Sequence, residues 1–435
     1  MSFTGHDWIM VGCVLAAMLS LLWGAGKLSA RFGIAPETKR KSIHVLTGLI
    51  SLSFPWLFSS PLPVILMIVV SLLTMAALRS PIVKNHSMST VLHDVQRQSF
   101  GEFYILISIG FLFAHSVGNP VLYVLPLTVI ALSDTGSALI GTKYGKKRLS
   151  IFDGEKTIEG SVAFFIITLL VSLILLMLLT DMAEVNLIIL SSIIAAFCTF
   201  IESDSWEGLD NLFVPVGAHI LLVQLFDATP SELITAFAMM ITAIVVMNQF
   251  APLLKLTTRT ARAYTLLIIL FTVVRPNPQV IFPLMAIIGH FFSRTSHPAL
   301  TSKRDFEMIA ATATVAMIWM FADILVPESA IDLFNLTYAA AAVIFVGLAF
   351  NKKWRILIVP FALLTGAFYI YTTNLRLNAT VWMEHDLILP TVSIGLAVAC
   401  VYLRPKMFDR HRSVKSYAIS IIAPAVCFIF YAVLT

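Results

Sequence analysis

The sequence predicts an all-α protein, a polytopic transmembrane helical bundle of about 16 spans. Of its 435 residues, 58% are hydrophobic and 12% are charged, and the mean hydropathy is +0.90. A soluble domain carries about twice that charged fraction. Apolar runs of about 17–22 residues recur along the chain, which is enough to cross a hydrocarbon core of about 30 Å. These segments are expected to be helices, because lipid offers no partners to the backbone groups of an isolated strand or loop.

Polar segments separate the apolar runs, and the basic segments alternate along the chain. The first predicted span covers residues 8–28. If both termini lie outside, nearly all Lys and Arg residues fall in cytosolic loops, as the positive-inside rule requires. These loops are residues 27–41, 79–97, 143–156, 202–211, 255–262, 294–304, 352–355 and 404–415. The net charge of +5 is therefore a topological bias, and we expect no nucleic-acid partner.

Four polar segments of the N-terminal half fall on this predicted cytosolic face. They are residues 37–44, the loop that ends at Glu102, residues 133–161 and residues 202–211. Lysine and arginine neutralise phosphate oxygens, carboxylates hold Mg²⁺, and glycines let a backbone approach phosphate groups. Their convergence at one surface of an integral membrane protein predicts a cytosolic active site for a metal-bound nucleotide.

Each segment also has an interpretation without a ligand. Small residues recur every four positions from Ser133 to Gly145, a pattern typical of helix packing. The basic residues 146–148 are typical of a topology anchor or a lipid-headgroup contact, and residues 156–160 suit a helix cap. The acidic residues 202–210 differ, because carboxylates at a membrane face oppose the basic bias and are costly unless they bind something.

The order and spacing of these blocks resemble the family of polytopic lipid-alcohol kinases. That family includes dolichol kinase, phytol kinase and the CTP-dependent diacylglycerol kinase, and it is related to the phosphatidate cytidylyltransferases. The resemblance covers about residues 30–225 and rests on these blocks: Glu37-x2-Arg40-Lys41-x2-His44-x3-Gly48, Gly101-Glu102, Asp134-x3-Ala138-x2-Gly141-x3-Gly145-Lys146, Lys156-Thr157-x-Glu159-Gly160-Ser161, and Glu202 with Asp210-Asn211-x3-Pro215. The chain is longer than is common in that family, and residues 226–435 carry no motif of it.

The resemblance implies a reaction and a set of site residues. The reaction is transfer of the γ-phosphoryl group of CTP, or of ATP, to the hydroxyl of a lipid alcohol, either a prenol of the dolichol or phytol type or a diacylglycerol. Mg²⁺ is the implied cofactor. The implied catalytic set is Asp134, Lys156, Glu159 and Asp210, the implied metal ligands are Asp134, Glu202 and Asp210, and Glu102 is a further candidate. The residues implied for nucleotide and phosphate binding are Arg40, Lys41, His44, Gly141, Gly145, Lys146, Thr157, Gly160, Ser161 and Asn211.

Other interpretations stay open at this point. Cytidylyl transfer from CTP to a lipid phosphate needs the same cations and Mg²⁺, and the sequence leaves open which carboxylate accepts a proton and which holds the metal. A transporter places ionisable residues near the bilayer midplane, whereas the charges of the N-terminal half lie at span ends. The sequence predicts a catalytic domain over residues 1–226 and an additional transmembrane domain of unknown role over residues 227–435. The four cysteines lie in apolar segments at unrelated spacings, which predicts neither a disulfide framework nor a zinc site.

Overall fold

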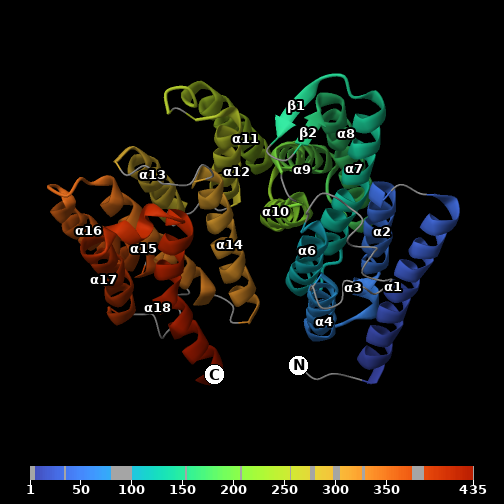
Figure 1. The fold of residues 1–435 in the computed structure, drawn as a ribbon, viewed down its shortest axis with the longest axis horizontal. Coiled ribbons are helices and arrows are strands. Elements are labelled where there is room, and N and C mark those ends of the chain that lie inside the picture. The colour runs from blue at the N-terminus through green and yellow to red at the C-terminus, as the bar shows by residue number, and fades with distance from the viewer. Residues whose placement is uncertain are drawn as a thin grey trace. The chain divides into compact units, whose positions relative to one another are not determined.

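The chain forms two compact units in the computed structural model, Met1–Thr242 (unit 1) and Ala243–Thr435 (unit 2) (Figure 1). The structure describes residues 5–33, 36–79, 100–151, 154–205, 208–254, 256–274, 280–296, 304–325, 329–374 and 387–434. The division between the units falls within helix α11 (Pro230–Phe250), whereas the sequence places the domain boundary after residue 226.

Unit 1 is a bundle of apolar helices that carries a short β-hairpin at one end. Strands β1 and β2 pair antiparallel, with Leu149 opposite Lys156, and the hairpin connects the end of α7 to the start of α8 (Figure 1). The elements before α11 are α1 (Gly5–Phe32), α2 (Pro36–Ser51), α3 (Phe54–Leu57), α4 (Pro61–Arg79), α6 (Gly101–His115), α7 (Val121–Tyr144), β1 (Arg148–Ile151), β2 (Gly154–Thr157), α8 (Ile158–Leu179), α9 (Glu184–Asp204) and α10 (Asp210–Leu225).

An aromatic cluster closes the end of unit 1 where α7 begins. Phe54, Phe113 and Tyr123 are buried and meet edge to face, with centroid distances of 6.4 Å for Phe54–Phe113 and 5.7 Å for Phe113–Tyr123. The Tyr123 hydroxyl donates to the Ser51 carbonyl at 2.8 Å, which satisfies its polar atom. This contact joins the end of α2 to the start of α7, so the two helices run antiparallel.

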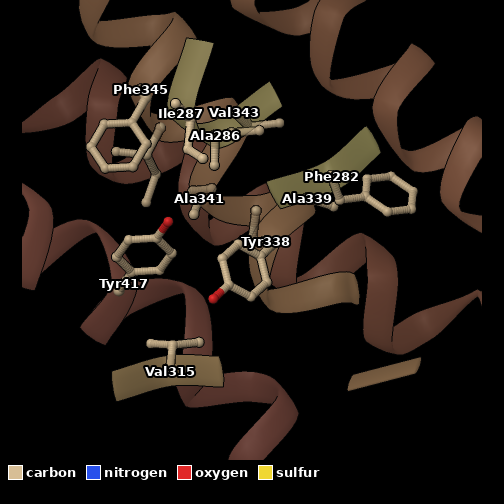
Figure 2. Close-up of a cluster of buried hydrophobic side chains, with 14 of the residues drawn as sticks. Phe282, Ala286, Ile287, Val315, Tyr338, Ala339, Ala341, Val343, Phe345 and Tyr417 are labelled. Atoms are coloured by element: carbon tan, nitrogen blue, oxygen red, sulfur yellow. The ribbon is translucent and has the colours of Figure 1, made fainter. Parts of the chain in front are cut away.

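Unit 2 is built around one helix, α15 (Ser329–Ala349). Every one of its residues from Leu336 to Phe345 is buried, as expected of a helix that is apolar on all sides. Figure 2 shows Tyr338 and Phe345 of α15 beside Phe282 and Tyr417 of neighbouring helices. The other elements of unit 2 are α12 (Thr258–Val274), α13 (Ile281–Ser296), α14 (Arg304–Leu325), η3 (Arg355–Leu357), α16 (Ile358–Asn374), α17 (Ile388–Leu403), η4 (Pro405–Asp409) and α18 (Arg412–Leu434).

The all-α transmembrane fold is confirmed. A helix occupies the place of each of the predicted spans, and eight helices of the described chain are long and apolar enough to cross a membrane. Seven further apolar helices of 10–17 residues lie within the described ranges. The protein is therefore an integral membrane protein. The hairpin of β1 and β2 was not predicted, because its eight residues carry no alternating apolar pattern.

Candidate active site

The small residues near the end of α7 bring that helix against the start of α8. A methyl group added at Gly141 would lie 2.7 Å from Oγ1 of Thr157, and one added at Gly160 would lie 2.9 Å from the same atom and 3.1 Å from the Ser137 carbonyl oxygen. One added at Gly145 would overlap the Gly141 carbonyl and the Thr157 side chain. A side chain larger than hydrogen would clash at these three positions. The helix-packing interpretation of the small residues from Ser133 to Gly145 is therefore confirmed. A role of these glycines toward phosphate stays a prediction.

The turn from β2 into α8 is fixed by two side chains. Thr157 is the N-cap of α8, and its Oγ1 accepts from the backbone N–H of Gly160 at 3.1 Å. Glu159 accepts at 3.3 Å from the backbone N–H of Lys147. It therefore ties the first turn of α8 to the segment that enters β1. Both contacts fix the backbone next to Lys156, the residue before Thr157. A direct chemical role of Glu159 stays a prediction.

Lys156 forms a half-buried ion pair with Glu202 at the end of α9. Its Nζ lies 2.6 Å from Oε1 of Glu202 and also donates to the Glu202 backbone carbonyl. The side chains are 18% and 7% exposed, respectively, so solvent screens the pair only in part. Burial by itself lowers the pKa of Lys156, but the charges of Glu202, Asp210 and Asp134 outweigh it and raise that pKa above its ordinary value. Lys156 is therefore a cation at neutral pH.

The charges of three carboxylates, from three different helices, therefore raise the pKa of one ammonium group, that of Lys156. Asp134 lies on α7, Glu202 on α9 and Asp210 at the first position of α10, and we call these three residues the carboxylate cluster. Asp134 and Asp210 are half-buried, whereas Glu202 is 5% exposed. The prediction that residues 133–161 and 202–211 meet is confirmed by this arrangement.

Three buried polar atoms on the segments that carry this cluster lack hydrogen-bond partners among the described residues. Within the described part of the chain, Oε2 of Glu202, Oγ of Ser205 and Oγ of Ser161 accept or donate no hydrogen bond. Ser205 is the C-cap of α9, and its backbone N–H donates to the Glu202 carbonyl at 3.2 Å. Buried polar groups in folded proteins are normally hydrogen-bonded, so such a group needs an explanation, of which a bound ligand is one.

The remaining polar segments of unit 1 point to the same end of the bundle. A methyl group added at Gly48 would lie 3.4 Å from Cβ of Ala131, so Gly48 of α2 lies beside Ala131 of α7. This agrees with the antiparallel course of the two helices. The first turns of α2, with Arg40, Lys41 and His44, therefore lie toward the Asp134 end of α7. The side chains of these three residues lie outside the described part of the structure.

Glu102 is brought to the same end by α6. Ser108 donates to the Asn211 carbonyl at 2.8 Å, and Phe111 packs edge to face on His219 at 5.7 Å. Helices α6 and α10 therefore pack against each other, with the start of α10 beside Ser108 of α6, and Glu102 lies in the first turn of α6. It is half-buried and is not among the charges that raise the pKa of Lys156.

The other predicted residues take different places. Lys146 is exposed in the connection between α7 and β1. Asn211 is buried, and its backbone N–H contacts the Asp210 carboxylate at 3.1 Å. Ser205 was missed by the sequence reasoning, although it lies in the acidic segment; no spacing rule distinguishes it from Ser203, whose hydroxyl is bonded to the Phe200 carbonyl.

Oxygen donors suited to Mg²⁺ are present in the carboxylate cluster. Within the described residues, no three His, Cys, Asp or Glu side chains are gathered closely enough to hold a metal ion by themselves. Mg²⁺ keeps several waters and is usually held by one or two carboxylates together with substrate phosphates. Asp134 and Asp210, which are half-buried, fit that role, and the Mg²⁺ assignment stays a proposal.

Comparisons with known proteins give two findings. The model of the Cytidylyltransferase family matches residues 1–203. A phytol kinase of Synechocystis is 28% identical over 219 residues, which is 49% of this chain and 90% of that protein. No solved structure matches the chain. These findings support a family relationship between the N-terminal half and the polytopic lipid kinases. Asp210 lies beyond the residues that the family model matches.

Proposed function

We propose that this chain, related in its N-terminal half to the polytopic lipid kinases, transfers the γ-phosphoryl group of a nucleotide to the hydroxyl of a membrane-embedded alcohol. CTP is the favoured donor and ATP the other candidate. The acceptor is a prenol of the phytol or dolichol type or a diacylglycerol. The observation that carries the proposal is the carboxylate cluster around Lys156 at one end of the bundle.

The chemistry of phosphoryl transfer matches this set of charges. Little covalent chemistry is asked of the protein, so catalysis comes mainly from positioning and from cations that neutralise the phosphates. Lys156 has three N–H donors, two of which contact Glu202. Among the described residues no acceptor takes the third N–H, which we propose contacts a phosphate oxygen. Asp134 and Asp210 would hold Mg²⁺, whose charge would offset that of the phosphates.

The membrane location of the site supports a lipid acceptor. Glu202 lies within the last turn of α9, an apolar helix that is long enough to span a membrane. Lys156 lies two residues before the start of α8, another such helix. A hydroxyl on a lipid reaches this depth by diffusion within the bilayer. The positive-inside pattern supports a cytosolic orientation, where nucleoside triphosphates are available.

Cytidylyl transfer from CTP to a lipid phosphate is the second candidate, because the matching family model is described as Cytidylyltransferase. The name of the phytol kinase relative favours the alcohol kinase. In the kinase reaction the lipid receives the γ-phosphorus, and in the cytidylyl transfer it receives the α-phosphorus with the nucleoside.

A labelling experiment tests both candidates. Membranes that contain the protein are incubated with Mg²⁺ and with CTP or ATP labelled at the γ or the α position, together with phytol, dolichol, diacylglycerol or phosphatidate. We expect γ-label in a lipid phosphate, loss of this product in Lys156→Met, and its retention in Lys143→Met, whose exposed side chain lies outside the cluster. Lipid that retains only α-label identifies a cytidylyltransferase, and the absence of labelled lipid with every donor and acceptor refutes both.

A further inference from the structure

The short connection between α15 and α16 buries its arginine and exposes its apolar residues. Every residue from 351 to 357 is exposed except Arg355, which is 8% exposed. Trp354 and Ile356 on either side of it are 58% and 59% exposed. This order is the reverse of the usual one, because a guanidinium stays charged in proteins and a charge is costly to bury unless it is paired. The burial of this one cation therefore needs a reason.

Arg355 has no anionic partner within the described part of the chain. Its Nε is fully buried there without a hydrogen bond, and no described carboxylate lies within ion-pair distance of it. Glu307 is occupied by His411 at 3.3 Å and by the backbone N–H of Ser413 at 2.9 Å. Asp332 lies in the first turn of α15, whereas Arg355 follows the last turn of that helix. Among the described residues, nothing neutralises the guanidinium.

Helix packing places Arg355 where three helix ends come together. Ile358, three residues after it, is buried at the start of α16. A methyl group added at Gly347 of α15 would overlap Cδ1 of Ile358 and would lie 3.0 Å from Cγ1 of Val401 of α17. The end of α15, the start of α16 and the end of α17 are therefore in contact within one helical turn of Arg355.

This end of unit 2 has the composition of a membrane surface. Residues 352–355 and 404–415 lie in loops that the positive-inside rule assigns to the cytosol. The exposed cations that flank the three helix ends are Lys352, Lys353, Arg404 and Lys406. Trp354 and Tyr402 are exposed aromatic residues, which are typical of the boundary between bilayer and water. Arg355 is therefore expected at the level of the lipid head groups.

We propose that Arg355 binds the phosphate group of an anionic membrane lipid. The fork of N–H donors on a guanidinium matches two oxygens of one phosphate. The contact is assigned to the terminal nitrogens Nη1 and Nη2, which are not among the fully buried polar atoms that lack a partner. The exposed cations nearby attract anionic lipid to this surface, and the exposed side chains of Ile356 and Leu357 suit its acyl chains. A free phosphate would supply the charge but not the apolar contact.

The site lies in unit 2 and does not depend on the reaction proposed for unit 1, so it is tested without nucleotide. Full-length protein in delipidated neutral detergent is titrated with phosphatidylglycerol, phosphatidylserine or phosphatidylcholine, and bound lipid is counted by native mass spectrometry. We expect both anionic lipids to bind more tightly than phosphatidylcholine by about tenfold or more, the usual effect of hydrogen bonds to a charged group. Arg355→Met should abolish this preference. Arg31→Met, which removes an exposed arginine of α1, should retain it.

Thermal unfolding of the same proteins separates a ligand site from a structural role. Without lipid, Arg355→Met should have a Tm equal to or above that of wild type, because it removes a buried charge that has no partner among the described residues. Phosphatidylglycerol should raise the Tm of wild type and leave that of Arg355→Met unchanged. Arg355→Lys keeps the charge but loses the planar fork, so its lipid affinity should fall between those of wild type and Arg355→Met.

Three results would refute the lipid site. They are wild-type lipid binding by Arg355→Met, equal affinity of the wild-type protein for phosphatidylcholine and the anionic lipids, and a lowered Tm or loss of folding of Arg355→Met in the absence of lipid. Inorganic phosphate is the soluble arm of the titration. If it displaces phosphatidylglycerol at equal concentration, the residue binds a free anion and the lipid assignment is wrong.

Discussion

Replacement of Lys156 by methionine should destabilise unit 1 as well as abolish the proposed activity. A pair of unit charges 2.6 Å apart attracts by about 6 kcal/mol at an effective dielectric constant of about 20. Desolvation of the two ions offsets most of this attraction, so the intact pair contributes little net stability. Methionine removes the attraction and leaves the Glu202 carboxylate buried and unpaired. A cost of about 3–5 kcal/mol is typical of that change.

A double variant separates the charge effect from the packing effect. Methionine keeps most of the apolar stem of lysine, so Lys156→Met combined with Glu202→Gln removes both charges at nearly constant volume. We expect the double variant to recover most of the lost free energy of unfolding but none of the lipid phosphorylation. The two single variants should therefore be strongly non-additive, as residues in direct contact are.

The assay is reversible unfolding in mixed micelles, followed by tryptophan fluorescence, for wild type, both single variants and the double variant. Lys143→Met, an exposed lysine at the end of α7, is the matched control and should unfold like wild type. A Lys156→Met protein with wild-type stability, or a double variant less stable than either single variant, would refute the inferred ion pair.

Three further predictions follow from the site. Gly145→Ala should lower the free energy of unfolding by about 1–3 kcal/mol, because its methyl group overlaps the Gly141 carbonyl and Thr157. The control is Gly12→Ala on α1, whose methyl group meets nothing within 4 Å. Thermal unfolding of both variants measures the difference. The pKa of Lys156 is raised in the folded state, so its stabilising contribution is fully present below the unfolded pKa of about 10.4 and is lost only as pH rises through the folded value. The difference in Tm between wild type and Lys156→Met should therefore be equal at pH 7, 8 and 9, and a difference that shrinks by pH 9 would contradict the raised pKa. Finally, a chain that ends after α11 should retain lipid phosphorylation, because the family model matches residues 1–203. Loss of activity in a folded truncation would make unit 2 part of the enzyme.

The sequence was sufficient to predict the class of fold and the end of the bundle that carries the site. Hydropathy and run length determine helices in a bilayer, because the backbone has no other way to pair its polar groups there. Charged residues gather at helix ends for the same reason. The meeting of residues 133–161 with residues 202–211 followed from the count of spans between them, and the contact of Lys156 with Glu202 confirms it.

The role of each carboxylate was beyond the sequence. Asp134, Glu202 and Asp210 are alike as acidic residues that the sequence places at span ends, although α7 continues beyond Asp134 to Tyr144. Spacing along the chain does not fix which oxygen faces an ammonium group. Nor could the sequence decide between packing and phosphate binding for the small residues of α7, since both uses require the absence of a side chain. The tertiary structure decided the packing role, through the approach of Thr157 and Gly160 to Gly141.

What the sequence by itself determined was therefore a polytopic helical membrane protein with a charged site at one end of its N-terminal unit. What only the tertiary structure decided was the pairing within that site: Lys156 is bound to one oxygen of Glu202, and the other oxygen and the Ser205 hydroxyl have no partner among the described residues. The physical reason is that hydropathy acts along each helix separately. An ion pair depends on distances between helices, and those are set by the close packing of α7, α8 and α9.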